Sequence, residues 1–320
     1  MTYQDLAWLD LSGDFDDAHT LAEVVELILC IEREPFLSAS ELRSKFPSGN
    51  QPTDSQMMFA FSEIADRSRQ MRNLYPFKRD GRGVTFDSSA AWQLYSFLLL
   101  LSFKGTPIRT DREWPRSDLI FDDISSRSLR AKLGSNAQSL IFGSPPRGGR
   151  PSKFPDAVEW AAKAIGVELR TAVGKIPTVQ KDGGVDVIAW APFRDRRLGF
   201  PIVLMQNTIQ VNYVKKPRDV DPHRWRDWID FGSTPQVGFA IPFHVPANHI
   251  WWNEISSEVP YFFDRGRLLE QLGGQDPRRW QVWGKVVDFV NFEIRTLLER
   301  SEFGTSKLQP VNARKRKARR

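Results

Sequence analysis

The stretch KDGGVDVIAWAPFRDRRLGFPIVLMQN, residues 181–207, places two apolar runs around a polar loop. Both runs have the composition of buried strands, so the segment predicts two neighbouring strands of one sheet. Asp186 interrupts the first run directly after a Gly-Gly turn. Because burying an ionised carboxylate without a partner is costly, we expect Asp186 to lie at the rim of the sheet beside a cation, a basic side chain or water.

Helical and strand-like segments alternate around this stretch, from residue 153 to about residue 300. Apolar positions at helical spacing predict helices, and short apolar runs predict strands. The predicted order is helix 154–166, strands 167–173, 185–193 and 200–211, helix 221–231, strand 236–245 and helix 282–300. This α-β-β-β-α-β alternation predicts an α/β (α+β) domain with a mixed sheet flanked by helices.

The first part of the chain has a different pattern. Apolar positions predict helices over residues 20–33 and 53–71, with a shorter helix between them. Asp80-Gly81 then separates two short strand-like runs, which predicts a β-hairpin over residues 75–86. Three helices followed by a hairpin are the order of a winged-helix domain.

A winged helix that binds DNA places its third helix in the major groove and its hairpin near phosphates. The basic residues on these two elements are Arg67, Arg69 and Arg72 on the helix and Lys78, Arg79 and Arg82 on the hairpin. Two other interpretations stay open. One is a small helical domain with a solvated hairpin, and the other is a winged helix that contacts protein instead of DNA.

The net charge of +6 comes from one end of the chain. The segment ARKRKARR, residues 313–320, holds six basic residues, so the rest of the chain has no excess charge. This segment is either a solvated, disordered end or a non-specific contact for phosphates. The single cysteine, Cys30, excludes a disulfide framework and a cysteine-based zinc site. The longest apolar run, residues 92–103, is too short to span a bilayer, so we expect a cytoplasmic protein without a membrane partner.

A second polar residue, Gln206, ends the apolar run PIVLMQ on the following predicted strand. Neighbouring strands can place Asp186 and Gln206 side by side at one rim of the sheet. Carboxylate and amide oxygens suit Mg²⁺, and the predicted helix upstream offers Glu159 as a further acid. The alternative for Asp186 is a structural carboxylate that caps the backbone of the Gly-Gly turn.

This arrangement resembles the PD-(D/E)xK phosphodiesterase superfamily, which is restriction-endonuclease-like and whose Gln variants include Mrr-type and other bacterial defence nucleases. The resemblance rests on Glu159 in a helix, GGVD before a strand and a next strand that ends in Gln206. The segments WRDWIDF, IPFHV and FFDRGRLLEQL add to it, so that it covers roughly residues 115–300. By this resemblance Asp186 is the central metal ligand, Gln206 replaces a second acid, and Glu159 is the helix acid.

The resemblance implies a metal-dependent endonuclease that hydrolyses phosphodiester bonds in DNA with Mg²⁺ or Mn²⁺, in bacterial defence against foreign DNA. The implied partners are DNA, subunits of a defence system and further copies of the chain. Glu168 and Asp122 are the alternatives for the helix acid. The implied parts are a helical winged-helix-like domain over 1–105, a connector with an amphipathic helix that could join the next domain over 106–150, a nuclease-like domain over 151–303 and a disordered basic tail over 304–320.

The sequence departs from the family pattern at the lysine expected two positions after Gln206, where Thr208 stands. Lys215 or Lys216, which follow the strand, are the favoured substitutes as the catalytic lysine, and Lys181 is the other. The alternative function is therefore a catalytically degenerate nuclease fold that binds nucleic acid or acts as a scaffold in a defence complex. Three histidines lack the spacing of a metal site and predict surface or structural roles: His223, His244 and His249.

Overall fold

The computed structural model describes residues 18–46, 49, 51–88, 92–103, 116–195, 197–246 and 249–303. The predicted basic tail, 304–320, residues 106–115 of the predicted connector and residues 104–105 before it lie outside these ranges. The described chain is a mixed α and β structure with a five-stranded mixed sheet and a small three-stranded antiparallel sheet. Within the described residues, no helix is both long enough and apolar enough to cross a membrane.

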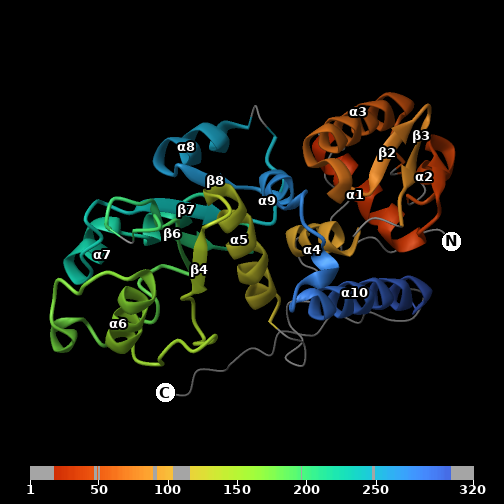
Figure 1. Ribbon diagram of the computed structural model, residues 1–320. Helices are drawn as coiled ribbons and strands as arrows, with labels where there is room; N and C mark the ends of the chain where they lie inside the picture. The colour runs from red at the N-terminus through yellow and green to blue at the C-terminus, as the bar shows by residue number, and fades with distance from the viewer. Residues whose placement is uncertain are drawn as a thin grey trace, which may run out of the picture.

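The first part of the chain forms three helices and the small sheet (Figure 1). Its elements are α1 (Ala18–Glu32), β1 (Phe36–Ser38), α2 (Ala39–Ser44), α3 (Asp54–Met71), β2 (Phe77–Asp80) and β3 (Gly83–Phe86), with the strands in the order β1–β3–β2. The hairpin expected over residues 75–86 is therefore present, and β1 adds a strand to its edge. Gly81 takes a left-handed φ of 56° in the two-residue turn, a conformation that glycine adopts without steric strain.

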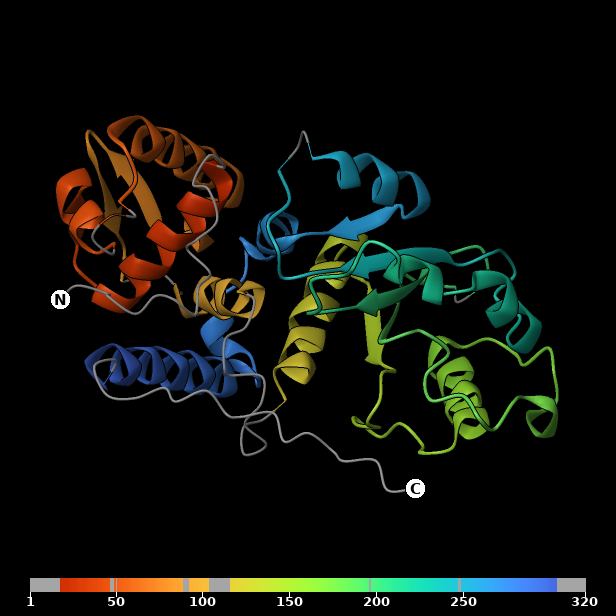
Figure 2. The same cartoon turned by 180° about the vertical axis from the view of Figure 1, so that it is seen from behind.

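The apolar run over residues 92–103 forms α4 (Trp92–Ser102), which is buried along its whole length. It packs against α1 and against the last helix, α10 (Trp283–Phe303). The rings of Phe97 and Phe289 meet edge to face with 5.0 Å between their centroids. The C-terminal helix of the predicted second domain therefore returns to the first part of the chain, as Figures 1 and 2 both show.

The larger sheet has the strand order β4–β5–β6–β7–β8, antiparallel from β4 to β6 and parallel from β6 to β8. Its strands are β4 (Gln138–Ile141), β5 (Val187–Trp190), β6 (Ile202–Asn207), β7 (Gln236–Ala240) and β8 (Tyr261–Phe263). The helices of this part are α5 (Ser117–Leu133), α6 (Phe154–Ile165), α7 (Pro222–Trp228), α8 (Ile250–Glu258) and α9 (Arg265–Leu272).

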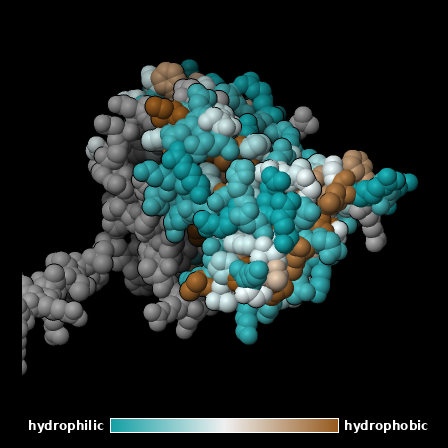
Figure 3. Space-filling view, turned by 90° about the vertical axis from the view of Figure 1, so that its left-hand side faces the viewer, coloured by the Kyte–Doolittle hydropathy of each residue, from teal (hydrophilic) through white to brown (hydrophobic). Residues whose placement is uncertain are grey.

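Helices cover both faces of this sheet because its central strands are apolar on both sides. Val187 and Met205 belong to the core that includes α5, whereas Ile188 and Leu204 belong to the core that includes α6 and α7. α5 and α6 therefore pack on opposite faces. Figure 3 looks onto the end of the molecule that carries α6 and α7, where hydrophilic residues cover most of the described surface and apolar residues form small, separate patches.

The predicted helix 154–166 and the predicted elements from residue 185 onward are present, but the predicted strand between them is not. Residues 167–173 form no strand, and only Leu169 makes an isolated bridge, to Ile229. β4, from the predicted connector, already pairs with the free edge of β5, so residues 167–173 have no edge of β5 to pair with. The helix before the first strand of the sheet is therefore α5, and α6 is inserted between β4 and β5.

Candidate functional site

Asp186 directly precedes β5, at a place where three strands meet. Its backbone N–H donates to Met205 O on β6 at 2.9 Å, and its carbonyl oxygen accepts from Phe142 N and Gly143 N, just after β4, at 2.7 and 3.0 Å. Its side-chain Oδ2 accepts from the backbone N–H of Asn207 at 2.8 Å. The carboxylate is thus held beside the ends of β4 and β6.

The local backbone makes room for this carboxylate. A Cβ atom on residue 143 would lie only 2.7 Å from Asp186 Oδ1, so any larger residue at that position would displace the carboxylate. The Gly-Gly turn is capped by a different acid, because Asp182 Oδ1 accepts from Gly184 N at 3.0 Å. Asp182 therefore takes the capping role that was the structural alternative for Asp186.

A second carboxylate reaches the same place from α5. Asp122 is buried, with 7% of its surface exposed, and its Oδ1 accepts from Asn207 Nδ2 at 2.8 Å. Asn207 therefore contacts both acids, Asp186 through its backbone and Asp122 through its side chain. Asp122 Oδ2 accepts from Arg147 Nη2 at 2.9 Å, and the same guanidinium donates to Asp123 at 2.8 Å. We call Asp122, Arg147, Asp186 and Asn207 the carboxylate cluster.

The two acids of the cluster resist simultaneous ionisation. Burial raises the pKa of Asp122 to about 6, although Asn207 and Arg147 lower it. Burial also raises the pKa of Asp186 well above its ordinary value, and the charge of Asp122 raises it further. A divalent cation bound by both carboxylates would remove this conflict. Asn207 Oδ1, which is buried and has no hydrogen-bond partner among the described residues, is a third oxygen of the kind that Mg²⁺ and Mn²⁺ prefer.

Gln206 lies on the opposite face of β6 from Asn207, because successive residues of a strand alternate. Its Nε2 donates to Asp219 Oδ2 at 3.1 Å, and Lys216 Nζ lies 3.4 Å from the same oxygen. No hydrogen bond between described residues joins Gln206 to Asp186. The amide side chain beside the acids is therefore Asn207 and not the expected Gln206, and a shift of one residue along a strand is enough to exchange the two faces.

Glu159, the acid expected on the helix, lies on the outer side of α6. Its carboxylate pairs with Lys163 one turn further on, at 2.8 Å, and its side chain is 37% exposed. Glu168, one of its two alternatives, is also exposed. The structure brings the other alternative, Asp122, to Asp186, because α5 and not α6 packs on the face of the sheet where the cluster lies.

No lysine in the described part of the chain forms an ion pair or a hydrogen bond with either acid of the cluster. Lys215 is exposed at the start of a short 3₁₀ helix, Lys216 pairs with Asp219, and Lys181 is exposed. The structure therefore does not bring the expected catalytic lysine to this place. The basic group of the cluster is Arg147, from the glycine-rich loop after β4.

Arg147 and Asn207 are the two members of the cluster that the sequence analysis missed. Asn207 follows Gln206 directly, and the period of two along a strand offered it as an equal candidate. Arg147 had no comparable signal, because its contact with Asp122 depends on how the loop after β4 folds back onto α5.

The hairpin residues expected to contact DNA are only partly available to a ligand. Lys78 and Arg82 are exposed on the β2–β3 hairpin. Arg79 is half-buried and donates to Ser62 on α3 at 3.1 Å. The hairpin therefore presents two unobstructed cations and a third that is tied to the neighbouring helix.

The predicted DNA-contacting helix, α3, does not present Arg67 to a ligand. Arg67 is buried, and its Nη1 lies 2.8 Å from Glu26 Oε1 on α1. Arg69 is exposed but pairs with Asp66 on its own helix. The side chain of Arg72 lies outside the described residues. The expectation for Arg67 is therefore wrong, because the helix turns this residue toward the interior of the protein.

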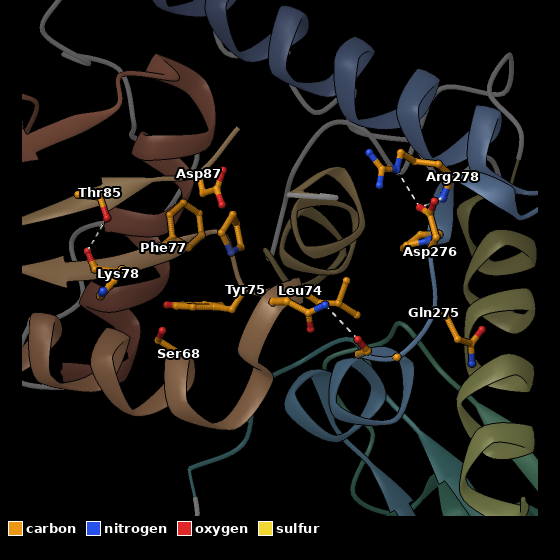
Figure 4. A pocket seen from close by; sticks show the side chains of 15 residues that line it. Ser68, Leu74, Tyr75, Phe77, Lys78, Thr85, Asp87, Gln275, Asp276 and Arg278 are labelled. Carbon is orange, nitrogen blue, oxygen red and sulfur yellow. Dashed lines mark hydrogen bonds and ion pairs between the residues drawn. The ribbon is translucent and has the colours of Figure 1, made fainter. Parts of the chain in front are cut away.

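A cavity of about 810 Å³ lies between the hairpin and the segment after α9 (Figure 4). Its lining includes the ring of Tyr75, two acidic residues, Asp87 and Asp276, and two basic residues, Lys78 and Arg278. Asp276 and Arg278 pair with each other at 2.8 Å. Because these charges balance, the cavity offers no excess positive charge to a phosphate, and we assign it no role in binding nucleic acid.

Comparison with known proteins finds no matching family model, no matching curated protein and no matching solved structure. The function of the chain is therefore inferred from its own residues. The structure defines a mixed α and β protein with a partly buried, oxygen-rich carboxylate cluster at one end of its larger sheet.

Proposed function

We propose that the chain is a metal-dependent phosphodiesterase that cuts DNA, with the carboxylate cluster as its active site. One observation carries this proposal. Asp122 and Asp186 come from different elements, both contact Asn207, and burial raises the pKa of both. Such a place favours a divalent cation, Mg²⁺ or Mn²⁺, which the two carboxylates and Asn207 Oδ1 would hold.

The topology supports the same proposal. Apart from α6, which is inserted between β4 and β5, the elements α5, β4, β5, β6, α7 and β7 follow the α-β-β-β-α-β order of the restriction-endonuclease-like class that the sequence resembles. In this chain that order brings together the acid of α5 and the acid before β5. The first three helices and their hairpin have the order of a winged helix, which would hold the DNA. A role in bacterial defence is part of the proposal through the same resemblance.

The residues of the cluster have distinct roles in this proposal. Asp122 and Asp186 would hold the cation, which when bound would supply Lewis-acid stabilisation of the phosphoryl oxygens and an activated water. Asn207 holds the two carboxylates in place, and Arg147 fixes the rotamer of Asp122. No described lysine contacts the cluster, so we assign no side chain as general base. Since such a base contributes about 10²- to 10⁴-fold, we expect slow turnover.

A second candidate function is binding of nucleic acid, or of a defence-complex subunit, without cleavage. One observation favours it: Arg147 and Asn207 already satisfy much of the hydrogen bonding of both acids without a cation. A cluster that is internally satisfied in this way also serves as a structural link between α5 and the sheet.

Incubation of supercoiled plasmid with the purified chain tests the two candidates. With Mg²⁺ or Mn²⁺ we expect nicked and linear DNA, and with EDTA we expect neither. Calorimetric titration with Mn²⁺ is the second measurement. Binding of Mn²⁺ without cleavage would favour the second candidate, and failure to bind the ion at all would overturn the proposed active site.

The raised pKa of Asp122 predicts that the metal-free protein loses stability as pH rises. This pKa is about 6 in the folded chain, against an ordinary value of 3.8. The carboxyl therefore stays protonated in the folded chain while it ionises in the unfolded chain. Stability falls between about pH 4 and pH 6, by about 3 kcal/mol at about 1.4 kcal/mol per unit. Above about pH 6 the full loss of stability from the ionised Asp122 carboxylate is present.

Urea unfolding in EDTA at several values between about pH 4 and pH 7 measures this effect. We expect Asp122→Asn to become more stable than the unchanged protein as pH rises. Mn²⁺ should reduce this difference in the free energy of unfolding, because it stabilises only the unchanged protein. Asp195→Asn, on the exposed loop between β5 and β6, is the control and should show a constant difference. If the stability difference between Asp122→Asn and the unchanged protein is equally constant with pH, the pKa of the Asp122 carboxyl is not raised in the folded chain.

Changing Lys78, Arg79 and Arg82 together to Ala should weaken DNA binding. The slope of log K against log salt should become shallower by up to about 2.7, because each of the three phosphate contacts contributes about 0.9. Fluorescence anisotropy at several salt concentrations measures this slope. The matched control replaces three exposed lysines on or near α6: Lys153, Lys163 and Lys175. A slope that stays the same in the hairpin variant would assign the hairpin to a protein interface.

A further inference from the structure

Three residues that are far apart in the sequence meet where the first part of the chain contacts the sheet part. They are His19 on α1, Glu63 on α3 and His244 between β7 and α8. One possible ligand atom from each lies within 4.8 Å of the others. The spacing of the histidines along the sequence predicted no such group, and none of the three residues belongs to the carboxylate cluster.

The distances in this group suit metal coordination better than hydrogen bonding. Glu63 Oε1 lies 3.6 Å from His19 Nδ1 and 3.6 Å from His244 Nε2. A good N–H···O hydrogen bond measures about 2.7–3.2 Å, so both distances are long for one. Ligands of a tetrahedral Zn²⁺, each about 2.0–2.2 Å from the ion, lie about 3.4 Å from one another. The two imidazole rings are nearly parallel, with 5.4 Å between their centroids.

Neighbouring groups leave a lone pair on each of the two nitrogens. Arg67 Nη2 lies 2.7 Å from His19 Nδ1, and because a guanidinium only donates, that nitrogen carries no proton. Asp264 Oδ2 lies 3.5 Å from His244 Nδ1, which is too long for a good hydrogen bond, and Nδ1 is buried without a hydrogen-bond partner among the described residues. The charge of this nearby carboxylate favours a proton on Nδ1 and a lone pair on Nε2. Arg67 Nη2 has a second acceptor in the carbonyl oxygen of His19 at 3.3 Å, so it can release Nδ1 to a cation.

The charges around the three residues do not balance without a cation. The ionic network around them, in which Glu23 and Glu63 are partly exposed, contains four carboxylates and two guanidiniums: Glu23, Glu26, Glu63, Asp264, Arg67 and Arg265. With both histidines neutral, it carries two excess negative charges. Arg67 pairs with Glu26 and Arg265 with Glu23, each at 2.8 Å, and Arg67 Nε also donates to Glu63 Oε1 at 3.2 Å. Glu63 therefore shares one guanidinium with Glu26, and the four carboxylates still exceed the two guanidiniums. One divalent cation would neutralise this excess.

The group also has room for a ligand that the chain does not supply. His244 lines two cavities, one of about 490 Å³ that Glu63 also lines and one of about 250 Å³ that His19 also lines. Either is large enough for several water molecules. A zinc ion held by three protein ligands usually takes a water as its fourth.

We propose that His19, Glu63 and His244 bind a zinc ion that links α1 and α3 to the sheet part of the chain. Asp264 is the positioning residue, because its charge favours the His244 tautomer in which Nε2 carries the lone pair. Two imidazoles and one carboxylate suit Zn²⁺, whereas the oxygen-rich carboxylate cluster suits Mg²⁺ or Mn²⁺. The zinc site is therefore separate from the proposed active site and does not depend on it.

Titration with Co²⁺, a visible-absorbing substitute for Zn²⁺, tests the site on the full chain. The chain carries Asp122→Asn and Asp186→Asn, so that the carboxylate cluster cannot supply the signal. We expect one Co²⁺ per chain, with the strong absorption of a tetrahedral ion, and its displacement by Zn²⁺. Zn²⁺ should also raise the melting temperature.

Four variants in this background assign the ligands. His244→Gln and Glu63→Gln should each abolish the tetrahedral Co²⁺ absorption. Asp264→Asn, which can still cap α9, should weaken binding by about 10- to 100-fold, as expected for a group that sets the tautomer of a ligand. His223→Gln, on the exposed surface of α7, is the matched control and should bind like the parent chain.

Circular dichroism establishes which variants are folded before they are compared. A folded parent chain that binds neither Co²⁺ nor Zn²⁺ would overturn the proposal, and so would a full Co²⁺ signal in folded His244→Gln. A third measurement, nitrogen NMR of the metal-free protein, reports whether each imidazole carries one proton or two. If both His19 and His244 are doubly protonated near neutral pH, protons and not a metal ion neutralise the excess charge, and the proposal fails.

Discussion

Asp122→Asn and Asp186→Asn are each expected to lower metal-dependent DNA cleavage by about 10³-fold or more while the fold is retained. A cation acting as a Lewis acid supplies several kcal/mol of transition-state stabilisation, and about 4 kcal/mol corresponds to about 10³ in rate. Each substitution removes one carboxylate ligand and keeps the size of the side chain. Because it also removes a charge that is unfavourable to bury, stability should not fall. Initial rates of plasmid nicking in Mn²⁺, with urea unfolding of the same samples, measure both quantities.

Two further substitutions make this result specific. Asp195→Asn, on an exposed loop, should cut at the unchanged rate. Glu159→Gln decides between the two helix acids, and we expect little effect because this carboxylate pairs with Lys163 on the outside of α6. Loss of cleavage in Glu159→Gln but not in Asp122→Asn would contradict the assignment of the acid to α5. Full activity in Asp186→Asn would remove the active site from the carboxylate cluster.

Arg67→Met is expected to lower the free energy of unfolding by about 3–5 kcal/mol, the usual effect of removing one partner from a buried ion pair. Arg67 is buried on α3, and its Nη1 lies 2.8 Å from Glu26 Oε1 on α1. Glu26 is fully buried as well, and its two oxygens accept from the hydroxyls of Tyr75 and Tyr95 at 2.5 Å each. Without the guanidinium, this carboxylate would lose its closest cation in a place that water does not reach.

Arg69→Met is the matched control, two residues further along the same helix. Arg69 pairs with Asp66 on the surface, where such a pair contributes little, and we expect a change within about 0.5 kcal/mol. Adding Glu26→Gln to Arg67→Met should recover part of the lost stability, because the uncompensated charge disappears. Urea unfolding of the variants measures all of these differences. Equally small effects at positions 67 and 69 would mean that Arg67 faces solvent, as contact with a DNA groove requires.

The sequence by itself determined the local structure around Asp186. An acid that follows a Gly-Gly turn and precedes an apolar run predicts a carboxylate at the start of a strand, and β5 begins at the next residue. The hairpin around Gly81 and the buried helix α4 could be predicted from the sequence equally well, because turn chemistry and continuous apolar composition act within a few residues. In each case the deciding interactions lie within one element or its turn.

Only the tertiary structure decided which groups surround Asp186. Helical periodicity marks an outer and an inner side of α5 and of α6, and both helices carry acids. Which helix packs on which face of the sheet depends on the pairing of β4 with the edge of β5. The choice of Asn207 over Gln206 depends in the same way on the register of β6 against its neighbours. The meeting of His19, Glu63 and His244 likewise depends on how the first part of the chain docks against the sheet part. Local sequence specifies which side of an element is buried, whereas the partner on that side is set by packing between segments that are distant along the chain.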